Sequence, residues 1–368
     1  MKISRISVYQ IDLPLTEPYF LSGGRLRFDL LDSTFVRIDT DAGISGWGEG
    51  CPWGHTYLPA HGPGVRAALH CLAPALIGLD PRSLDHVNRV MDHTLPGHPY
   101  AKSPLDIACW DILGQSSDMP LWQLLGGQDG VAVHVNSSIS TGTPDQMVAL
   151  IKRARASGYR THSAKLGGRD PQTDIARIDA ICDALLPGEF VTFDINRAWL
   201  PGVALQVLNA VDTMAWIEQP CETIEQCAYV ARNVRQPVLL DECLHDMGDH
   251  LSAWKMQACT GIKVKPNRLG GLTRARQVRD FALQVGWKMH IEDVGGSALA
   301  DTAAIHLAAS TPSEFHMDSW LCHAHLSVDP VPGQGARNQS GLAAPPSSPG
   351  LGVVPDDGAL GKPVAVYT

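Results

Sequence analysis

Hydrophobic and polar residues alternate in the first fifty positions of the chain, which predicts a small unit built around β-strands. The alternation begins over residues 6–9 and returns over 33–39. The second run stops at the turn residues 41–43, and a further short strand follows over 44–49. The strands 33–39 and 44–49 are therefore predicted to form a hairpin. A glycine-bearing loop, 22–25, separates the first strand from the second.

A helical spacing replaces this alternation between about 64 and 125. Within it, Ile107 and Trp110 lie three positions apart and mark one apolar face. Ser103 is predicted to cap this helix and Pro104 to occupy its first turn, since a serine oxygen accepts from free amides and proline needs no amide partner there.

Short apolar runs and helical stretches take turns from about residue 131 onward. Eight of the runs are predicted strands, and those in the middle of the series are about 25 residues apart, which is room for a strand, a helix and two loops. The predicted strands are 131–136, 161–165, 190–194, 214–218, 238–241, 261–265, 288–292 and 314–318. Such even spacing favours a parallel barrel over an open sheet.

Composition and charge exclude several classes of protein. Of the 368 residues 44% are hydrophobic, enough for a large core, and the net charge of −9 argues against a nucleic-acid partner. No apolar run reaches the roughly 18 residues of a membrane span, and no apolar signal segment follows the start. Nine cysteines without a CxxC pair indicate reduced thiols, so we expect a cytoplasmic protein with no membrane partner.

Charged residues end five consecutive predicted strands, at the place where a parallel barrel carries its chemistry. They are Lys165, Asp194, Glu218, Asp241 and Lys265. Three carboxylates this close repel one another strongly, and a hard dication such as Mg²⁺ among them removes that repulsion. The lysines lie on the strands before and after the three acids, so closing the barrel places them on opposite sides of the metal.

This arrangement suits the removal of a proton from the carbon next to a carboxylate. A dication bound to the carboxylate neutralises the charge of the ene-diolate that forms. A neutral lysine can act as the base once burial and the dication bring its pKa down to roughly 7–8. Two lysines on opposite faces can remove a proton from one side and deliver one to the other.

Other polar residues near these positions have structural explanations that we prefer. Lys263 also points inward by the two-residue period of a strand, but it is expected to lie deeper in a structural pair. Glu242 follows Asp241 and should point the other way, supporting the site from behind. His323 and His325 could suggest zinc, yet no second cluster at ligand spacing completes such a site.

Taken in order, the motifs resemble the enolase superfamily, in the branch of muconate lactonizing enzyme and mandelate racemase. They are AKSPLDIACWD (101–111), AKLG (164–167), DINR (194–197), EQP (218–220), DE (241–242), KPNRLGG (265–271) and PGLGV (349–353). The resemblance covers essentially the whole chain. It implies one Mg²⁺ per subunit, with Mn²⁺ as a substitute, held by the three strand-end carboxylates, and an acid/base pair formed by the two lysines.

The resemblance also implies the fold class, which is α/β: a modified TIM barrel, (β/α)7β, with an N-terminal α+β capping domain. We expect the capping domain over 1–125, the barrel with the metal and acid/base site over 126–325, and a C-terminal segment that returns to the capping domain over 326–368. Cap loops that help to choose the substrate would include 22–25 and 51–61. A homo-oligomer is expected, because closed symmetric assemblies are common.

Two departures from the family pattern bear on the chemistry. The second strand reads Ser163-Ala164-Lys165 where the family often has Lys-x-Lys, so a cation that helps to lower the pKa of Lys165 is missing. Strand seven carries Glu292-Asp293 in place of the histidine of the mandelate racemase type, and that subtype is set aside.

Within the family, the chain is most similar to cis-3-hydroxy-L-proline dehydratases. The matching stretches are LSGGRL (21–26), PWGHTY (52–57), PGHPYAKS (96–103), HSAK (162–165) and GGSALAD (295–301). In the cis isomer the C2 hydrogen and the C3 hydroxyl lie on opposite ring faces, so one lysine takes the proton while the other protonates the leaving hydroxyl. The product would tautomerise to Δ1-pyrroline-2-carboxylate.

Two alternatives to the dehydratase remain. The same lysines without a leaving group would epimerise C2, as in 2-epimerases of hydroxyproline betaine, proline betaine or another amino-acid derivative. A catalytically inactive relative is the third hypothesis, and the intact set of strand-end residues argues against it. In each catalytic case the partner is a small amino-acid substrate, whose predicted contacts are Ser22, Tyr57, Asn196, Glu292, Asp293 and Trp320.

Overall fold

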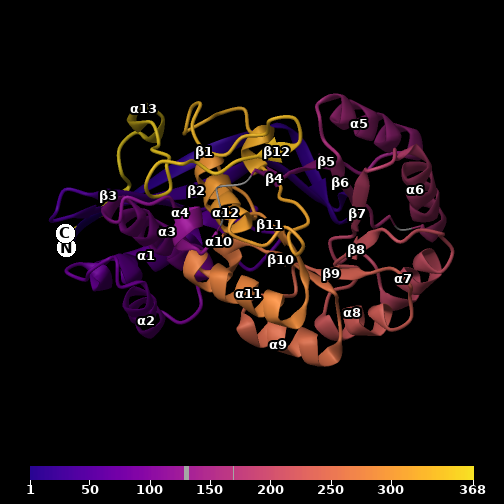
Figure 1. Cartoon of the computed structure of the whole chain (residues 1–368), viewed down its shortest axis with the longest axis horizontal. Helices are drawn as coiled ribbons and strands as arrows, with labels where there is room; N and C mark the ends of the chain where they lie inside the picture. The colour runs from indigo at the N-terminus through magenta and orange to yellow at the C-terminus, as the bar shows by residue number, and fades with distance from the viewer. Residues whose placement is uncertain (128–131, 169) are drawn as a thin grey trace.

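The computed structural model describes residues 1–127, 132–168 and 170–368. Its first part is a four-stranded sheet in the order β13-β1-β2-β3. The strands are β1 (Ile3–Leu21), β2 (Leu26–Thr40), β3 (Ser45–Gly50) and β13 (Ala365–Tyr367). Because β13 pairs antiparallel with β1 through Ile6 and Tyr367, the two ends of the chain lie side by side at this end of the molecule (Figure 1).

Helices α1 (Gly62–Leu76), α2 (Leu84–Thr94), α3 (Pro99–Ser116) and the short α4 (Leu121–Leu124) follow this sheet. The prediction that Ser103 caps a helix was wrong, since α3 begins at Pro99 and its N-cap is His98. Ser103 and Pro104 lie inside α3 and are buried. Pro99 already fills the first position that favours proline, and Pro104 then costs the helix one amide bond in its second turn.

Glycines at every second position of β3 let this strand lie directly on α3. A β-carbon would stand 2.2 Å from the Ala108 carbonyl oxygen at Gly46, 2.0 Å from that of Pro104 at Gly48, and 2.4 Å from that of Tyr100 at Gly50. The three carbonyls are four residues apart and so form one ridge of the helix. The strand and the helix therefore pack backbone against backbone, with no room for side chains between them.

We expect Gly48→Ala to destabilise the fold by about 2 kcal/mol or more, because the new methyl group meets the rigid backbone of Pro104 and no flexible side chain. Thermal unfolding followed by circular dichroism measures this effect. Gly202→Ala is the matched control, since no atom lies within 4 Å of its β-carbon position in α7 (Pro201–Leu208). Equal melting temperatures for the two variants would contradict the packing argument.

A seven-stranded parallel sheet in the order β11-β10-β9-β8-β7-β6-β5 forms the barrel. Its strands are β5 (Asn136–Ile139), β6 (Thr161–Lys165), β7 (Phe190–Asp194), β8 (Trp216–Glu218), β9 (Val238–Leu240), β10 (Gly261–Val264) and β11 (Lys288–Ile291). The helices between them are α5 (Pro144–Ala156), α6 (Pro171–Ala184), α7, α8 (Ile224–Ala231), α9 (Met247–Met256), α10 (Pro266–Leu269), α11 (Leu272–Val285) and, after β11, α12 (Ala298–Ala309). The long helices surround the curled sheet, which confirms the predicted α/β barrel with an N-terminal cap (Figure 1).

The structure corrects the first and last predicted strands. Residue 131 lies outside the described residues, and the rest of 131–136 divides into β4 (Val133–His134), which pairs with β12 (Leu342–Ala343), and the start of β5. Within 314–318, His316 forms one isolated bridge with Met289, and there is no continuous ladder. These residues still close the ring, because the Phe315 carbonyl accepts from the Met289 amide of β11 at 2.7 Å, and the next residue, Ser319, accepts from Asn136 of β5 at 2.8 Å.

Two further sequence predictions can be compared with the structure. All nine cysteines are free thiols, so no disulfide frame holds the fold together. Within the described ranges 1–127, 132–168 and 170–368, none of the helices combines the length and the apolar character that crossing a membrane requires.

Candidate active site

The five predicted charged residues meet at the mouth of the barrel. Lys165, Asp194 and Glu218 end β6, β7 and β8, and the sheet register places them side by side. Asp241 and Lys265 come directly after β9 and β10. All five are buried, with at most 8% of each residue exposed. The parallel barrel thus gathers onto one edge residues that span a hundred positions of sequence.

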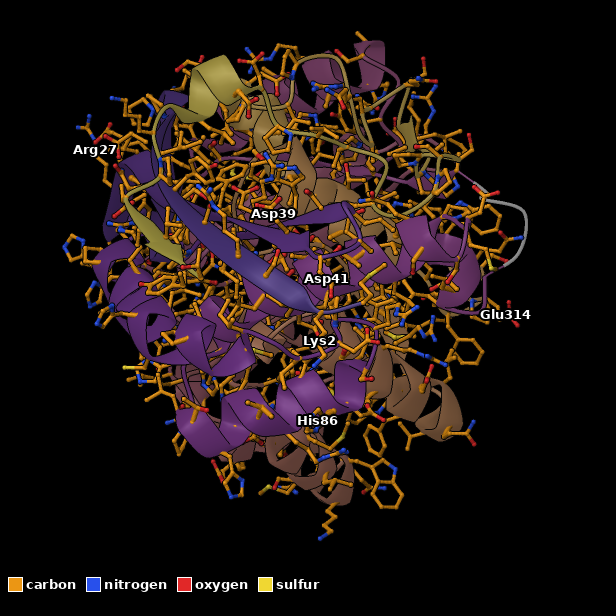
Figure 2. All side chains as sticks on the ribbon, turned by 90° about the vertical axis from the view of Figure 1, so that its left-hand side faces the viewer. Lys2, Arg27, Asp39, Asp41, His86 and Glu314 are labelled. Atoms are coloured by element: carbon orange, nitrogen blue, oxygen red, sulfur yellow. The ribbon has the colours of Figure 1, made fainter. Side chains whose placement is uncertain are left out.

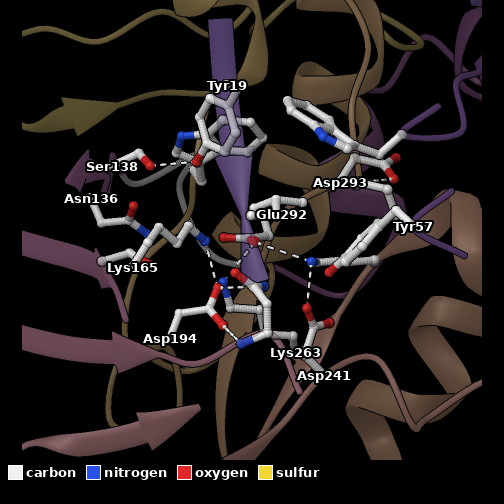
Figure 3. A pocket seen from close by; sticks show the side chains of 17 residues that line it. Tyr19, Tyr57, Asn136, Ser138, Lys165, Asp194, Asp241, Lys263, Glu292 and Asp293 are labelled. Carbon is white, nitrogen blue, oxygen red and sulfur yellow. Dashed lines mark hydrogen bonds and ion pairs between the residues drawn. The ribbon is translucent and has the colours of Figure 1, made fainter. Parts of the chain in front are cut away.

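Each of the two lysines is held by the carboxylate next to it. The Nζ of Lys165 donates to Oδ2 of Asp194 at 2.5 Å, and the Nζ of Lys265 donates to Oδ2 of Asp241 at 2.8 Å. Strands β7, β8 and β9 separate the strands that carry these lysines. Figure 3 shows Lys165 on one side of the pocket and Asp241, the partner of Lys265, on the other.

Lys263 lies between these two pairs at the bottom of the pocket (Figure 3). Its Nζ is 3.1 Å from Oε1 of Glu218 and donates to Oε1 of Glu292 at 2.8 Å. As the strand period predicted, Lys263 points inward and forms a buried ion-pair network. Oε1 of Glu292 is also 3.6 Å from the Nζ of Lys265, so Glu292 lies between two ammonium groups.

The buried charges shift one another's pKa values in opposite directions. Burial raises the pKa of Glu218 well above its usual range, and the negative charge of Asp194 adds to the shift. Burial also opposes ionisation of Asp194, but the ammonium groups of Lys165 and Lys263 together outweigh it and lower the pKa of Asp194. Burial would raise the pKa of Asp241 too, but the charges of Arg268 and Lys265 lower it. The three carboxylates therefore differ in how tightly they hold a proton.

Lys165 is stabilised in its charged form. Burial by itself would lower its pKa, but the charge of Asp194, followed by smaller contributions that include Glu218, raises it above the ordinary value. The pKa of roughly 7–8 expected of a lysine base is thus not a property of this lysine among these side chains alone. A bound dication would be needed to push it downward.

Asn196 fixes the orientation of Asp194. Its amide and its Nδ2 donate to Oδ1 and Oδ2 of Asp194 at 2.9 and 3.0 Å, and Nδ2 also reaches Oε1 of Glu242 at 3.1 Å. Glu242 accepts a second bond there, from the Tyr57 hydroxyl at 2.8 Å. Burial, together with the charge of Asp241, raises the pKa of Glu242 to about 7. As predicted, Glu242 lies behind the pocket and not on its wall.

Seventeen residues from the cap and the barrel line the pocket (Figure 3). Five of the six predicted substrate contacts are among them: Tyr57, Asn196, Glu292, Asp293 and Trp320. Ser22 is not on this wall. It is buried, and its hydroxyl donates to the carbonyl oxygen of Asn196 at 3.0 Å, so it fastens the cap to the loop after β7.

The comparisons with known proteins agree with this geometry. The family profile described as "Enolase C-terminal domain-like" matches residues 146–359, and the one described as "Mandelate racemase / muconate lactonizing enzyme, N-terminal domain" matches 27–126. The chain belongs to the enolase superfamily. The family resemblance drawn from the motifs is thereby confirmed, and this chain is an enzyme of that superfamily.

Three relatives of this enolase superfamily enzyme are a dehydratase, a racemase and a member whose structure has been solved. A cis-3-hydroxy-L-proline dehydratase from Roseibium aggregatum is 41% identical over 100% of both chains. An N-succinyl-L-Arg/Lys racemase from Bacillus cereus is 29% identical over 84% of this chain and 85% of the racemase. A solved superfamily member from Roseovarius nubinhibens ISM, complexed with magnesium, is 67% identical with a TM-score of 0.97, covering 100% of this chain and 99% of that one.

The donor set of this superfamily member fits a hard dication. Both carboxylate oxygens of Glu218 are buried without a hydrogen-bond partner, and Asp and Glu oxygens are the ligands that Mg²⁺ takes. Among the residues that the structure describes, no three His, Cys, Asp or Glu side chains converge closely enough to coordinate an ion. Asp194 and Asp241 are each bonded to a lysine instead, so holding an ion would require them to exchange the ammonium for it.

Sequence reasoning missed an aromatic wall of the pocket. The ring centroids of Tyr19 and Trp53 are 5.1 Å apart, and Trp320 lies 5.8 Å from Trp53 and 6.1 Å from Tyr19. The Tyr19 hydroxyl is 2.5 Å from Oγ of Ser138 on β5, which joins the cap to the barrel. Tyr19 lies near the end of a strand of 19 residues, and its sequence position carries no signal that would indicate a pocket residue.

Polar residues on the barrel wall were missed as well. Asn136 and Ser138 of β5, and Ser163 of β6, all line the pocket. The period of two could have found Ser163, because it stands two positions before Lys165 on the same strand. To recognise Asn136 as a pocket residue, the start of β5 would have to be known. The predicted strand 131–136 ends where β5 begins.

Proposed function

We propose that this enzyme removes the C2 proton of cis-3-hydroxy-L-proline and eliminates water, which gives Δ1-pyrroline-2-carboxylate. One observation carries the proposal: two buried lysines, each held by a carboxylate, line one pocket, and strands β7, β8 and β9 separate the strands that carry them. The dehydratase relative from Roseibium aggregatum, 41% identical over the full length, supports this substrate.

In this mechanism Lys165 and Lys265 divide the proton transfers between them. One lysine, as the neutral amine, takes the proton from C2, and the electron pair of that C–H bond forms the C2–C3 double bond. The C3–O bond breaks on the other ring face as the second lysine, as the ammonium, protonates the leaving hydroxyl. The resulting enamine moves a proton to carbon and becomes the cyclic imine.

Asp194, Glu218 and Asp241 are the proposed ligands of Mg²⁺. When bound, the ion would neutralise charge on the substrate carboxylate, which makes the neighbouring C2 hydrogen more acidic. Asn196 holds Asp194 in place through two hydrogen bonds, so this side chain is prearranged. That Mn²⁺ can substitute, that the enzyme is a homo-oligomer and that it is cytoplasmic remain predictions.

The remaining pocket residues are proposed to hold the pyrrolidine ring. Trp320 and Tyr57 offer ring faces for an apolar ring or a cationic nitrogen. Asp293 and Glu292 lie on the same wall and are the proposed contacts of the ring nitrogen. Asp293 is held by Asn267, whose Nδ2 donates to it at 2.8 Å, so its position does not depend on the substrate.

A 2-epimerase is the second candidate, with a betaine of proline or hydroxyproline or another amino-acid derivative as substrate. The paired lysines favour it, since an amine on either face can exchange the C2 proton when no hydroxyl leaves. The racemase relative from Bacillus cereus supports this reading of the same site.

Incubation in D₂O with Mg²⁺ separates the two functions. With cis-3-hydroxy-L-proline we expect a pyrroline carboxylate, detected by NMR and by its reaction with an aldehyde reagent for cyclic imines. The trans isomer is the matched control, because its C2 hydrogen and C3 hydroxyl share a face and the anti elimination is closed to it. Deuterium at C2 without loss of water would identify an epimerase. Absence of both products would contradict the dehydratase, and absence of C2 exchange with proline betaine and hydroxyproline betaine as well would contradict the epimerase.

A further inference from the structure

A second cavity lies between the cap and the barrel, apart from the active-site pocket. Its empty volume is about 900 Å³ including the opening to solvent. Its polar wall consists of Tyr100, Arg268, His61, His98 and His245. Neither Asp nor Glu occurs among the described residues that line it. An acid-free cavity with these side chains is unusual on a chain whose net charge is −9, and it favours a negatively charged ligand.

Two long helices begin at this cavity. His61 is the N-cap of α1, which has 15 residues, and His98 is the N-cap of α3, which has 18. The dipole of a helix attracts anions to its first turn. In α3 the dipole acts largely without free amides, because Pro99 has no N–H and the Ala101 amide donates to the His98 carbonyl at 3.0 Å. At the start of α1 the positive end of the helix dipole is partly neutralised, since the carboxylate of Asp32 lies against Gly62 and pairs with Arg66 at 2.7 Å. The start of α3 has no acidic residue in its first turn.

Two buried side chains on the wall lack hydrogen-bond partners. Arg268 has 2% of its side chain exposed; its Nη1 is paired with Oδ1 of Asp241 at 2.6 Å, and its Nε makes no hydrogen bond. Tyr100 is 4% exposed, and its hydroxyl has no partner either. Leaving such groups unsatisfied costs free energy, and a polar ligand in the cavity would satisfy them.

We propose that this cavity binds a phosphate group, carried by inorganic phosphate or by a small phosphorylated metabolite. A guanidinium, a phenol and imidazoles surround the space together with the positive end of the α3 dipole, and a tetrahedral anion has acceptor oxygens for donors that come from several directions. The site is independent of the proposed reaction. It borders that reaction through Arg268, which touches Asp241, and through Leu58, which follows Tyr57 of the active-site wall.

Isothermal titration at constant ionic strength tests the proposal, with inorganic phosphate in one arm and glycerol 3-phosphate in the other. Sodium chloride at matched ionic strength removes general screening effects. We expect saturable binding of at least one of the two compounds, and binding of the organic phosphate alone would identify a metabolite as the source. Tyr100→Phe should raise the dissociation constant at least about tenfold, because it removes one hydrogen bond to a charged group. His98→Ala should also weaken binding.

His86→Ala is the control, since His86 projects from α2 into solvent on the face shown in Figure 2 and lines no part of the cavity. This variant should bind phosphate as the unchanged protein does. The melting temperature of each variant without phosphate shows whether its fold is intact. The proposal is overturned if neither compound binds, or if Tyr100→Phe and His98→Ala bind as tightly as His86→Ala does.

Discussion

Lys265→Ala is expected to lower the turnover number of the dehydration about 10³-fold or more, and Lys165→Ala should do the same. Positioned proton transfer by a side chain contributes up to about 10⁴-fold. The third amine of the pocket, Lys263, is engaged by Glu218 and Glu292 and is not expected to replace either lysine. The fold should survive both changes, because strand-end residues serve the site more than the core. Steady-state kinetics with cis-3-hydroxy-L-proline and Mg²⁺ measures the loss.

Exchange of the C2 proton in D₂O then assigns the two roles. The variant that lacks the base should neither exchange this proton nor release water. The variant that lacks the acid should still exchange it while dehydration stops. Lys152→Ala is the control, because this lysine of α5 is exposed and does not line the active-site pocket. Full activity in either active-site variant would remove that lysine from the mechanism.

Glu218→Gln is expected to weaken Mg²⁺ binding at least about a hundredfold, since it removes the charge of the one proposed ligand that no hydrogen bond occupies. Without metal the variant should be no less stable than the unchanged protein. The folded-state pKa of Glu218 is raised, so its contribution to stability is present below its ordinary pKa and is lost as pH rises through the raised value. At neutral pH a neutral amide avoids this loss.

Calorimetric titration with MgCl₂ and thermal unfolding of the metal-free proteins measure the two effects. Glu222→Gln serves as the control, because this glutamate follows Glu218 by four positions but is exposed and pairs with Arg197 at 3.0 Å. Its Mg²⁺ affinity should equal that of the unchanged protein. Unchanged affinity in Glu218→Gln would contradict its assignment as a ligand, and a large drop in its metal-free melting temperature would contradict the argument about burial.

The barrel and its charged edge could be predicted because both depend on local repeats. A strand and a helix need about 25 residues, and a charged residue ends or directly follows each of five consecutive strands, so Asp194 and Glu218 could be recognised without any structure. The inward position of Lys263 came from the same two-residue period. Each of these inferences rests on contacts within one repeating unit or between neighbours.

What could not be predicted depends on contacts between distant segments. Tyr19 reaches the pocket because a long strand of the cap carries it there, and its meeting with Trp320 joins residues 300 positions apart. Ser103 is followed by proline, as a helix cap often is, but the helix begins earlier, at Pro99. Ser103 is buried inside α3, which packs closely against the glycines of β3. Ser22 was predicted as a contact and instead bonds to the backbone of Asn196.

The hydrogen bonds of Glu242 have a consequence for how the cap and the active site are connected. Tyr57 belongs to the cap, and its hydroxyl shares Oε1 of Glu242 with Asn196, the residue that orients Asp194. One oxygen of a buried carboxylate therefore connects the cap loop to the residue that orients Asp194. The position of this loop and the alignment of a proposed metal ligand are thereby linked.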